Sequence, residues 1–271
     1  MFQHVVVPID DSTAAWRAVP IAARMAAAVD GKLDVVTVVD RVAAVGAVLT
    51  NLRMGVDRLG ELAVEPSIEV LAHDSIVDAV GEYVEERNGA MIVMSSHGHG
   101  RSAAVVGSVT DEVLRTLFGP IVVIGPHVGE NAGRVDGSYV IPLDGSEHGD
   151  MIIPIASAWA IEFHAEPWLV EVIKPSATTP SDFMDSAYAA RHARKMQHEI
   201  DREVEFEVFR HDDPAKAIND FARRIDASLL FATTHGRSGM SRLRAGSVAA
   251  NLVRNAPCPI VLFRPPHLAE E

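Results

Sequence analysis

The chain reads Val5-Val6-Val7-Pro8-Ile9-Asp10-Asp11-Ser12 near its start, and it reads Tyr139-Val140-Ile141-Pro142-Leu143-Asp144-Gly145-Ser146 again at its middle. In both stretches an apolar run ends in an aspartate, and a serine follows two residues later. The two aspartates lie 134 residues apart (144 − 10), so this repeat is a duplicated domain and not one of the solenoid repeats of about 20–50 residues.

Two later motifs repeat in the same order. Met94-Ser95-Ser96-His97-Gly98 corresponds to Ala232-Thr233-Thr234-His235-Gly236, and Gly107-Ser108-Val109 corresponds to Gly246-Ser247-Val248. The offset has grown to 139 (246 − 107) at the last motif, so the second copy carries a net insertion of five residues. We therefore predict two domains, 1–128 and 137–271. The linker between them, Val128 to Gly137, is rich in Gly, Asn and Asp and has no hydrophobic period.

Strands and helices are expected to alternate within each copy. Strands that are apolar throughout are typical of a parallel sheet covered on both faces. The fold class is therefore α/β, with two tandem, doubly wound, Rossmann-like domains of five strands each. In such sheets ligands bind beyond the carboxyl ends of the strands. The first copy predicts strands at Val5–Ile9, Leu33–Val39, Ile68–Leu71, Ala90–Met94 and Ile121–Ile124, and helices at Thr13–Val29, from a Ser75 cap to Arg87, and from Ser108.

The segment after the second strand differs between the copies. In the first copy the residues between Val39 and Ile68 form a mixed pattern without a clear period. In the second copy an amphipathic helix is expected as an insertion, and its residues are explained by core packing: Met184, Tyr188, Arg191 and Arg194.

Composition excludes some classes of function. The formal net charge is −13, which argues against DNA or RNA as the main partner, because nucleic-acid affinity depends on clustered Lys and Arg. No segment has the apolar length of a membrane span and no leader precedes the first strand, so a cytoplasmic protein without membrane contact is expected. Cys258 stands in an apolar run and is expected to be a buried hydrophobe.

The second copy has the features of a phosphate site. Its fourth strand runs into a glycine-bordered loop that leads to the start of a helix, where unpaired N–H groups and the helix dipole favour an anion. Ser247 could cap that helix or contact a phosphate or Mg²⁺. Three arginines lie in the loop: Arg237, Arg242 and Arg244. The alternative is that the glycines only permit a turn and the arginines are solvated.

Asp144 strengthens the phosphate interpretation. It ends the first strand of the second copy, beside the carboxyl end of the fourth strand, where a carboxylate can accept hydrogen bonds from ribose hydroxyls. The alternative role for Asp144 is the N-cap of the next helix. A P-loop sequence is absent from the chain, and His97 and His99 have no companion cluster with metal-ligand spacing, so no metal site is expected.

The combination of these motifs resembles the universal stress protein family, over nearly the whole chain and twice. The resemblance implies the strand order 3-2-1-4-5, pairing of domains through their last strands, and ATP between the first and fourth strands. In the second copy it implies that Asp144 holds the ribose, that the main chain of Val172 meets the adenine, and that the phosphates lie among Thr233, Gly236, Arg237, Gly246, Ser247 and Val248.

The first copy departs further from the family pattern. The resemblance implies Asp10 for the ribose and Val38 for the adenine, with the phosphates among Ser95, Gly98, Gly107, Ser108 and Val109. Its loop encloses eight residues instead of nine and holds one arginine, Arg101. We therefore expect the second copy to be the better ATP site.

These features predict a regulatory, ATP-binding stress-response protein without a dedicated catalytic apparatus, with ATP bound alone or with Mg²⁺. Slow ATP hydrolysis stays open, because positioning and a metal supply much of phosphoryl-transfer catalysis. Two alternatives also stay open: an ATPase or nucleotidyl transferase of related fold, and an interaction module that binds no nucleotide. The resemblance further implies a homodimer in addition to pairing of the two domains within one chain.

Overall fold

The computed structural model describes residues 2–10, 12–87, 89–97, 107–117, 119–175, 182–234 and 247–264. The first half of the chain contains β1 (His4–Pro8), α1 (Thr13–Ala28), β2 (Lys32–Val39), a 3₁₀ turn (Val42–Ala44), α2 (Val45–Arg58), β3 (Pro66–Ala72), α3 (Ile76–Glu85), β4 (Ala90–Ser95), α4 (Ser108–Thr116) and β5 (Pro120–Ile124). The second half contains β6 (Ser138–Leu143), α5 (Glu147–Asp150), α6 (Ile152–Phe163), β7 (Glu166–Ile173), α7 (Asp182–Ile200), β8 (Glu205–Arg210), α8 (Pro214–Arg224), β9 (Leu229–Thr233), α9 (Ser247–Asn255) and β10 (Ile260–Phe263).

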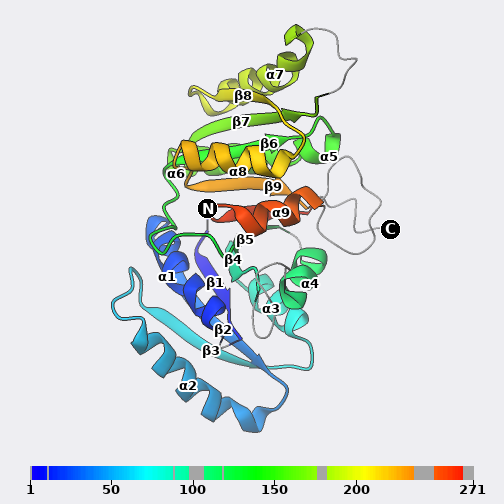
Figure 1. The fold of residues 1–271 in the computed structure, drawn as a ribbon. Coiled ribbons are helices and arrows are strands. Elements are labelled where there is room, and N and C mark those ends of the chain that lie inside the picture. Colours follow the sequence, from blue (N-terminus) through cyan, green and yellow to red (C-terminus); the bar gives the residue numbers. More distant parts are fainter. Residues whose placement is uncertain are drawn as a thin grey trace.

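All ten strands form one sheet in the order β3-β2-β1-β4-β5-β10-β9-β6-β7-β8 (Figure 1). Each half is parallel and has the predicted order 3-2-1-4-5. The halves join where β5 and β10 pair antiparallel, with Val123 opposite Ile260. The predicted fold class and the pairing of last strands are therefore confirmed. Because the two halves run in opposite directions, their carboxyl ends, and any sites there, lie at opposite edges of the sheet.

The helices cover both faces of the sheet. One apolar cluster joins the sheet to α1, α2, α6 and α7, and the other joins it to α3, α4, α8 and α9. This division follows from right-handed crossovers, which place the first two helices of each half on one face and the last two on the other. The first cluster continues across the two halves, since the ring of Phe2 lies 5.2 Å from the ring of fully buried Trp159. Cys258 is buried as predicted, and burial raises the pKa of its thiol to about 12.

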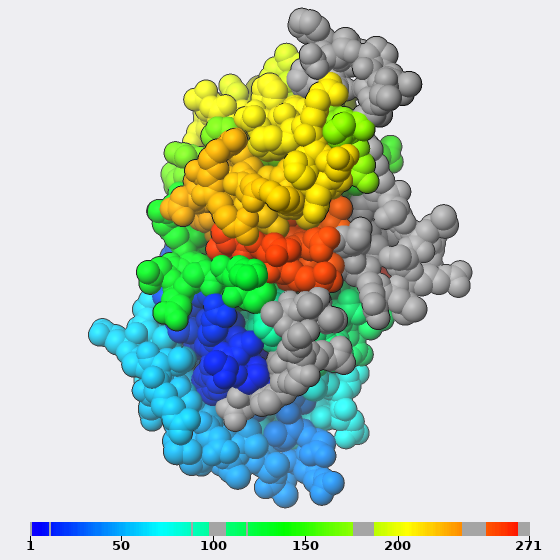
Figure 2. All heavy atoms as spheres, viewed as in Figure 1, coloured from blue at the N-terminus to red at the C-terminus, as the bar shows by residue number. Residues whose placement is uncertain are grey.

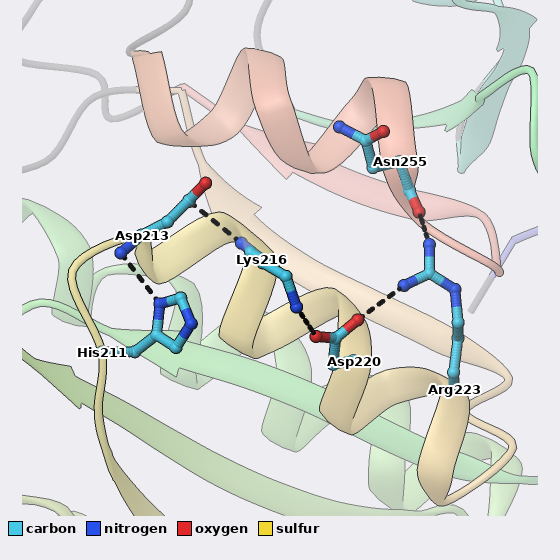
Figure 3. A network of polar contacts seen from close by, with 6 residues as sticks. All are labelled: His211, Asp213, Lys216, Asp220, Arg223 and Asn255. Carbon is cyan, nitrogen blue, oxygen red and sulfur yellow. Dashed lines mark hydrogen bonds and ion pairs between the residues drawn. The ribbon is translucent and has the colours of Figure 1, made fainter.

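A shared turn precedes α3 in the first half and α8 in the second half. In the first half the N–H of Ser75 donates to Nδ1 of His73 at 2.9 Å, and in the second the N–H of Asp213 donates to Nδ1 of His211 at 2.9 Å. Ser75 and Asp213 then cap α3 and α8. Figure 3 shows this cap in the second half and the polar chain that continues along α8 to the end of α9: Lys216, Asp220, Arg223 and Asn255. Because the same turn precedes both helices, Ile76 and Pro214 occupy equivalent positions at the starts of α3 and α8.

The linker is held against α1. The Arg17 guanidinium donates to the carbonyl of Val128 at 2.9 Å, and Arg24 donates to the carbonyl of Ala132 at 2.6 Å. Val128 and Val135 are buried although the linker sequence lacks a hydrophobic period. In Figure 2 the green atoms of this segment lie against the dark-blue atoms of α1. The linker is thus packed against the first half of the chain.

The helix predicted after the second strand of the second copy is confirmed as α7, but its interpretation as an insertion was wrong. The mixed pattern of the first copy forms α2, and α7 is its counterpart, so the helix of the second copy is not an insertion. Periodicity gave a weak signal because Leu52 is the one fully buried residue of α2, while Val48 and Leu59 pack against the core but are only partly buried. The helix also comes close to α1 at Gly55, where a Cβ would lie 2.2 Å from the Trp16 ring. In α7, Tyr188 packs against the core while Arg191 and Arg194 are exposed, and the side chain of Met184 lies outside the described residues.

Candidate functional site

A cavity of about 160 Å³ opens at the carboxyl ends of β1, β2 and β4. It lies where the strand order reverses, which is the expected ligand position in a doubly wound sheet. Six of the seven residues that the sequence assigns to the first-domain site line it: Asp10, Val38, Ser95, Gly107, Ser108 and Val109. The seventh, Gly98, lies outside the described residues.

Asp10 is fixed just beyond β1. Its Oδ1 accepts a hydrogen bond from the N–H of Ser12 at 3.1 Å, and the Ser12 hydroxyl in turn accepts one from the N–H of Ala15 and caps α1. The carboxylate therefore sits between the strand end and the helix start, at the wall of the cavity.

Asp144 holds the corresponding place in the second domain. Its Oδ1 accepts hydrogen bonds from the N–H of Ser146 at 3.0 Å and from the Ser146 hydroxyl at 2.6 Å. Ser146 caps α5. The alternative role of Asp144 as the N-cap is therefore wrong. Gly149 allows the first turn of α5 to lie close to the Asp144 carboxylate, since a Cβ at position 149 would lie 2.4 Å from Oδ1 of Asp144.

The start of α4 is tied to the end of β4. The Thr110 hydroxyl donates to the carbonyl of Ser95 at 2.9 Å, and the N–H of Gly107 donates to the carbonyl of Ser96 at 2.7 Å. A Cβ at Gly107 would lie 3.3 Å from Cα of His97, so glycine permits this contact. These hydrogen bonds hold the N-terminus of the nine-residue helix α4 at the cavity wall. The positive end of the helix dipole is therefore directed toward the cavity.

Sequence reasoning missed nine of the residues that line the cavity, among them Thr37, Ile76, Met94 and His97. The Thr37 hydroxyl donates to the carbonyl of Ile9 at 2.7 Å, next to Asp10. The ring of His97 is oriented by the Ser96 hydroxyl, 2.9 Å from Nδ1. The sequence did contain a signal for Ile76. Ser75 caps the helix that follows the third strand, so the first residue of that helix lies at the carboxyl ends of the strands.

The second-domain residues are described in part. Val172 lies in β7, Thr233 ends β9, and Ser247 and Val248 begin α9, with Val248 40% exposed. Gly236, Arg237 and Gly246 lie outside the described residues, as do Arg242 and Arg244. The ranking of the second copy above the first therefore stays a prediction.

A polar cluster connects α7 to α5 beside this second site. The Tyr188 hydroxyl donates to Oδ1 of Asp150, and Nε2 of His192 lies 3.4 Å from Oδ2 of the same carboxylate. Burial, with that hydrogen bond and the nearby carboxylates of Asp150, Asp144 and Glu171, raises the pKa of Tyr188 above its usual range. Burial lowers the pKa of His192 in spite of Asp150.

Metal ligands do not gather in the described ranges, where no group of three or more His, Cys, Asp and Glu is placed to hold an ion. Among the same residues no helix is long and apolar enough to span a membrane.

The profile of the universal stress protein family matches residues 1–125 and again residues 139–264. The chain belongs to the universal stress protein family. A universal stress protein of Methanocaldococcus jannaschii is 29% identical over 51% of this chain and 86% of its own length. One from Mycobacterium tuberculosis is 28% identical over 73% of this chain and 65% of its own length. The solved structure of a universal stress protein from Archaeoglobus fulgidus has a TM-score of 0.67 at 17% identity, covers 97% of this chain and 98% of its own, and shows the same fold.

Proposed function

We propose that this universal stress protein is a regulatory protein that binds ATP at the carboxyl edge of its sheet and has no dedicated catalytic apparatus. The observation that carries the proposal is the first-domain cavity. Residues from two sequence motifs that lie 97 positions apart (107 − 10), at Asp10 and at Gly107, line one space together with Val38.

Each wall of the cavity suits one part of the nucleotide. Asp10 offers a carboxylate to the ribose hydroxyls, and the main chain at Val38 lies in the neighbouring strand for the adenine. The α4 N-terminus, which begins at Ser108, offers its first N–H groups to the phosphates. Ser108 also carries a hydroxyl for a phosphate-bound Mg²⁺.

The size of the cavity suggests how much of the ligand is enclosed. Small-molecule pockets commonly measure about 300–1,000 Å³, and this one measures about 160 Å³. We propose that it encloses the adenosine and that the phosphates lie toward the open side, over α4.

The test is mass spectrometry of the nucleotide released when the purified protein is denatured, followed by titration of the emptied protein with ATP. The proposal predicts bound adenine nucleotide, or its uptake on titration, without phosphate release above that of the Asp10→Ala variant. Absence of both would refute nucleotide binding, and steady phosphate release that depends on Asp10 would identify an ATPase instead.

We also propose a cytoplasmic homodimer. Since β5 and β10 already pair within the chain, the second copy would dock through another surface. Light scattering coupled to size-exclusion chromatography checks the mass: a value near the 29.2 kDa of one chain would refute the dimer.

A further inference from the structure

His97 is the one described residue of the first-domain cavity wall that can carry a positive charge. Asp10 is acidic, and the other described lining residues are apolar or neutral. The phosphates of a nucleotide bring several negative charges to this space. Apart from His97, the described wall can offer them N–H groups, hydroxyls and the positive end of the α4 dipole. His97 is therefore the lining side chain that suits a phosphate best.

The His97 ring is held in place from the protein side. The hydroxyl of buried Ser96, which lies outside the described cavity wall, is 2.9 Å from Nδ1. The main chain of His97 is held as well, since the Ser95 hydroxyl donates to its carbonyl at 2.8 Å. Gly107, the N-cap of α4, lies against the same residue, because a Cβ there would be 3.3 Å from Cα of His97. The imidazole thus has a fixed position beside the start of α4.

The contact with Ser96 determines which ring nitrogen carries the proton. Within the described part of the chain, the Ser96 hydroxyl has Nδ1 of His97 as its one acceptor. A buried hydroxyl that donates to no acceptor is destabilising, so this hydroxyl donates to Nδ1. The proton of the neutral ring then lies on Nε2. Among the described residues Nε2 has no hydrogen-bond partner, so it is a donor available to a ligand.

The pair of a hydroxyl residue and a histidine occurs in both copies of the repeat. Thr234 and His235 correspond to Ser96 and His97. Thr234 is buried like Ser96, and His235 lies outside the described residues. The pair is present although the loops that follow it differ in length by one residue. This repetition supports a role that the two domains share.

We propose that His97 donates its Nε2–H to the phosphate chain of the nucleotide and gives the first-domain site its preference for nucleoside phosphates over the free nucleoside. A hydrogen bond to an ionised phosphate oxygen is charge-assisted and stronger than one between neutral groups. Asp10, at the ribose end, repels the phosphates, so a donor beside α4 also favours one orientation of the ligand. This inference rests on the proposed nucleotide site.

The test compares ATP with adenosine by calorimetric titration of the full chain. Asp144→Ala serves as the background, because it weakens the second site and leaves the first to be measured. His97→Asn keeps an acceptor for the Ser96 hydroxyl near the position of Nδ1 and removes the donor at Nε2. It should weaken ATP binding at least about tenfold, the effect of one hydrogen bond to a charged group, and change adenosine binding less than about twofold.

A second substitution and a spectroscopic signal test the donor itself. His97→Gln places an amide N–H near the position of Nε2 and should restore part of the ATP binding that His97→Asn loses. His198→Asn, at an exposed histidine of α7, is the control and should leave the binding of both ligands unchanged. In NMR spectra of the native chain, the ring signal of His97 is the one missing from His97→Asn. ATP should shift this signal more than adenosine does.

The outcomes separate this inference from the proposed function. ATP binding that His97→Asn leaves unchanged would overturn the inference while nucleotide binding stands. Equal weakening of ATP and adenosine binding in a folded His97→Asn protein would do the same, because it would show that His97 shapes the site without contacting the phosphates. Failure of both ligands to bind the native chain would overturn the proposed function and this inference with it.

Discussion

Nδ1 of His4 lies 2.7 Å from Oδ2 of Asp34, a carboxylate that is buried inside the first domain. The guanidinium of Arg87 is a positive group 3.7 Å from the same oxygen, and it stacks on the ring of Tyr83 at 3.4 Å. In the second domain the equivalents of Asp34 and Tyr83 are Trp168 and Phe221, whose rings lie 5.4 Å apart. The same place in the fold is filled by an ionic cluster in one copy and by an aromatic pair in the other.

This cluster predicts a cost for removing its central carboxylate. Asp34→Ala leaves His4 and Arg87 partly buried without their acceptor and should lower the free energy of unfolding by about 1–3 kcal/mol. Urea denaturation measures the change. Asp136→Ala is the control, since Asp136 is exposed and its ion pair with Arg134 should contribute less than about 1 kcal/mol. Equal effects of the two substitutions would contradict the prediction.

Two glycines of α2 form a matched pair. Gly55→Ala would place a Cβ 2.2 Å from the Trp16 ring, and the displacement of α2 should cost about 1–3 kcal/mol. Gly46→Ala meets nothing within 4 Å and should stabilise the protein by up to about 1 kcal/mol, because alanine favours a helix. Thermal unfolding of both variants distinguishes them, and an unfolding temperature of Gly55→Ala equal to or above that of the native protein would show that Gly55 is not needed for packing.

His192 should make the docking of α7 depend on pH. Its pKa in the folded protein is lowered by burial and by Arg191 and Lys195, with Asp150 acting in the opposite direction. Folding therefore favours the neutral form of the His192 ring. The stabilisation is fully present above the unfolded pKa of about 6.5 and is lost as the pH falls through the lowered folded pKa.

Hydrogen exchange of α7, corrected for intrinsic rates, measures this effect between pH 7.5 and pH 5. Protection in the native protein should decrease on acidification, and His192→Gln should remove much of that decrease. His198→Gln is the control on the same helix, because His198 is exposed. Identical pH dependence in the native protein and His192→Gln would assign the loss to other groups.

Much of the fold could be predicted from local signals in the sequence. The Ser12 and Ser75 caps, the apolar strands and the duplicated Asp10 and Asp144 motifs each specify a local element or its repetition. The joining of β5 to β10 came only from the family resemblance, because no local pattern distinguishes a strand paired within the chain from one paired between chains.

The site was predicted less completely. Motif residues such as Asp10 and Gly107 were found because they interrupt strands and helices in a recognisable way, whereas Thr37 and Met94 are ordinary strand residues whose role depends on the tertiary position. The helix α2 was missed because its core-facing stripe is weak: Leu52 alone is buried, and Gly55, its close contact with Trp16, carries no hydrophobic signal.

The central claim is that the carboxyl edge of the sheet binds nucleotide through Asp10, and calorimetric titration of ATP into the nucleotide-free protein tests it most directly. Asp10→Ala should weaken the first-domain site about 10- to 100-fold, because hydrogen bonds to a charged group contribute about 1.5–3 kcal/mol. Asp10→Asn, which keeps an oxygen for Ser12, should weaken it less. The control Asp40→Ala, which removes an exposed carboxylate just after β2, should leave it unchanged. ATP binding that is equally strong in the native protein, Asp10→Ala and Asp40→Ala would contradict the account.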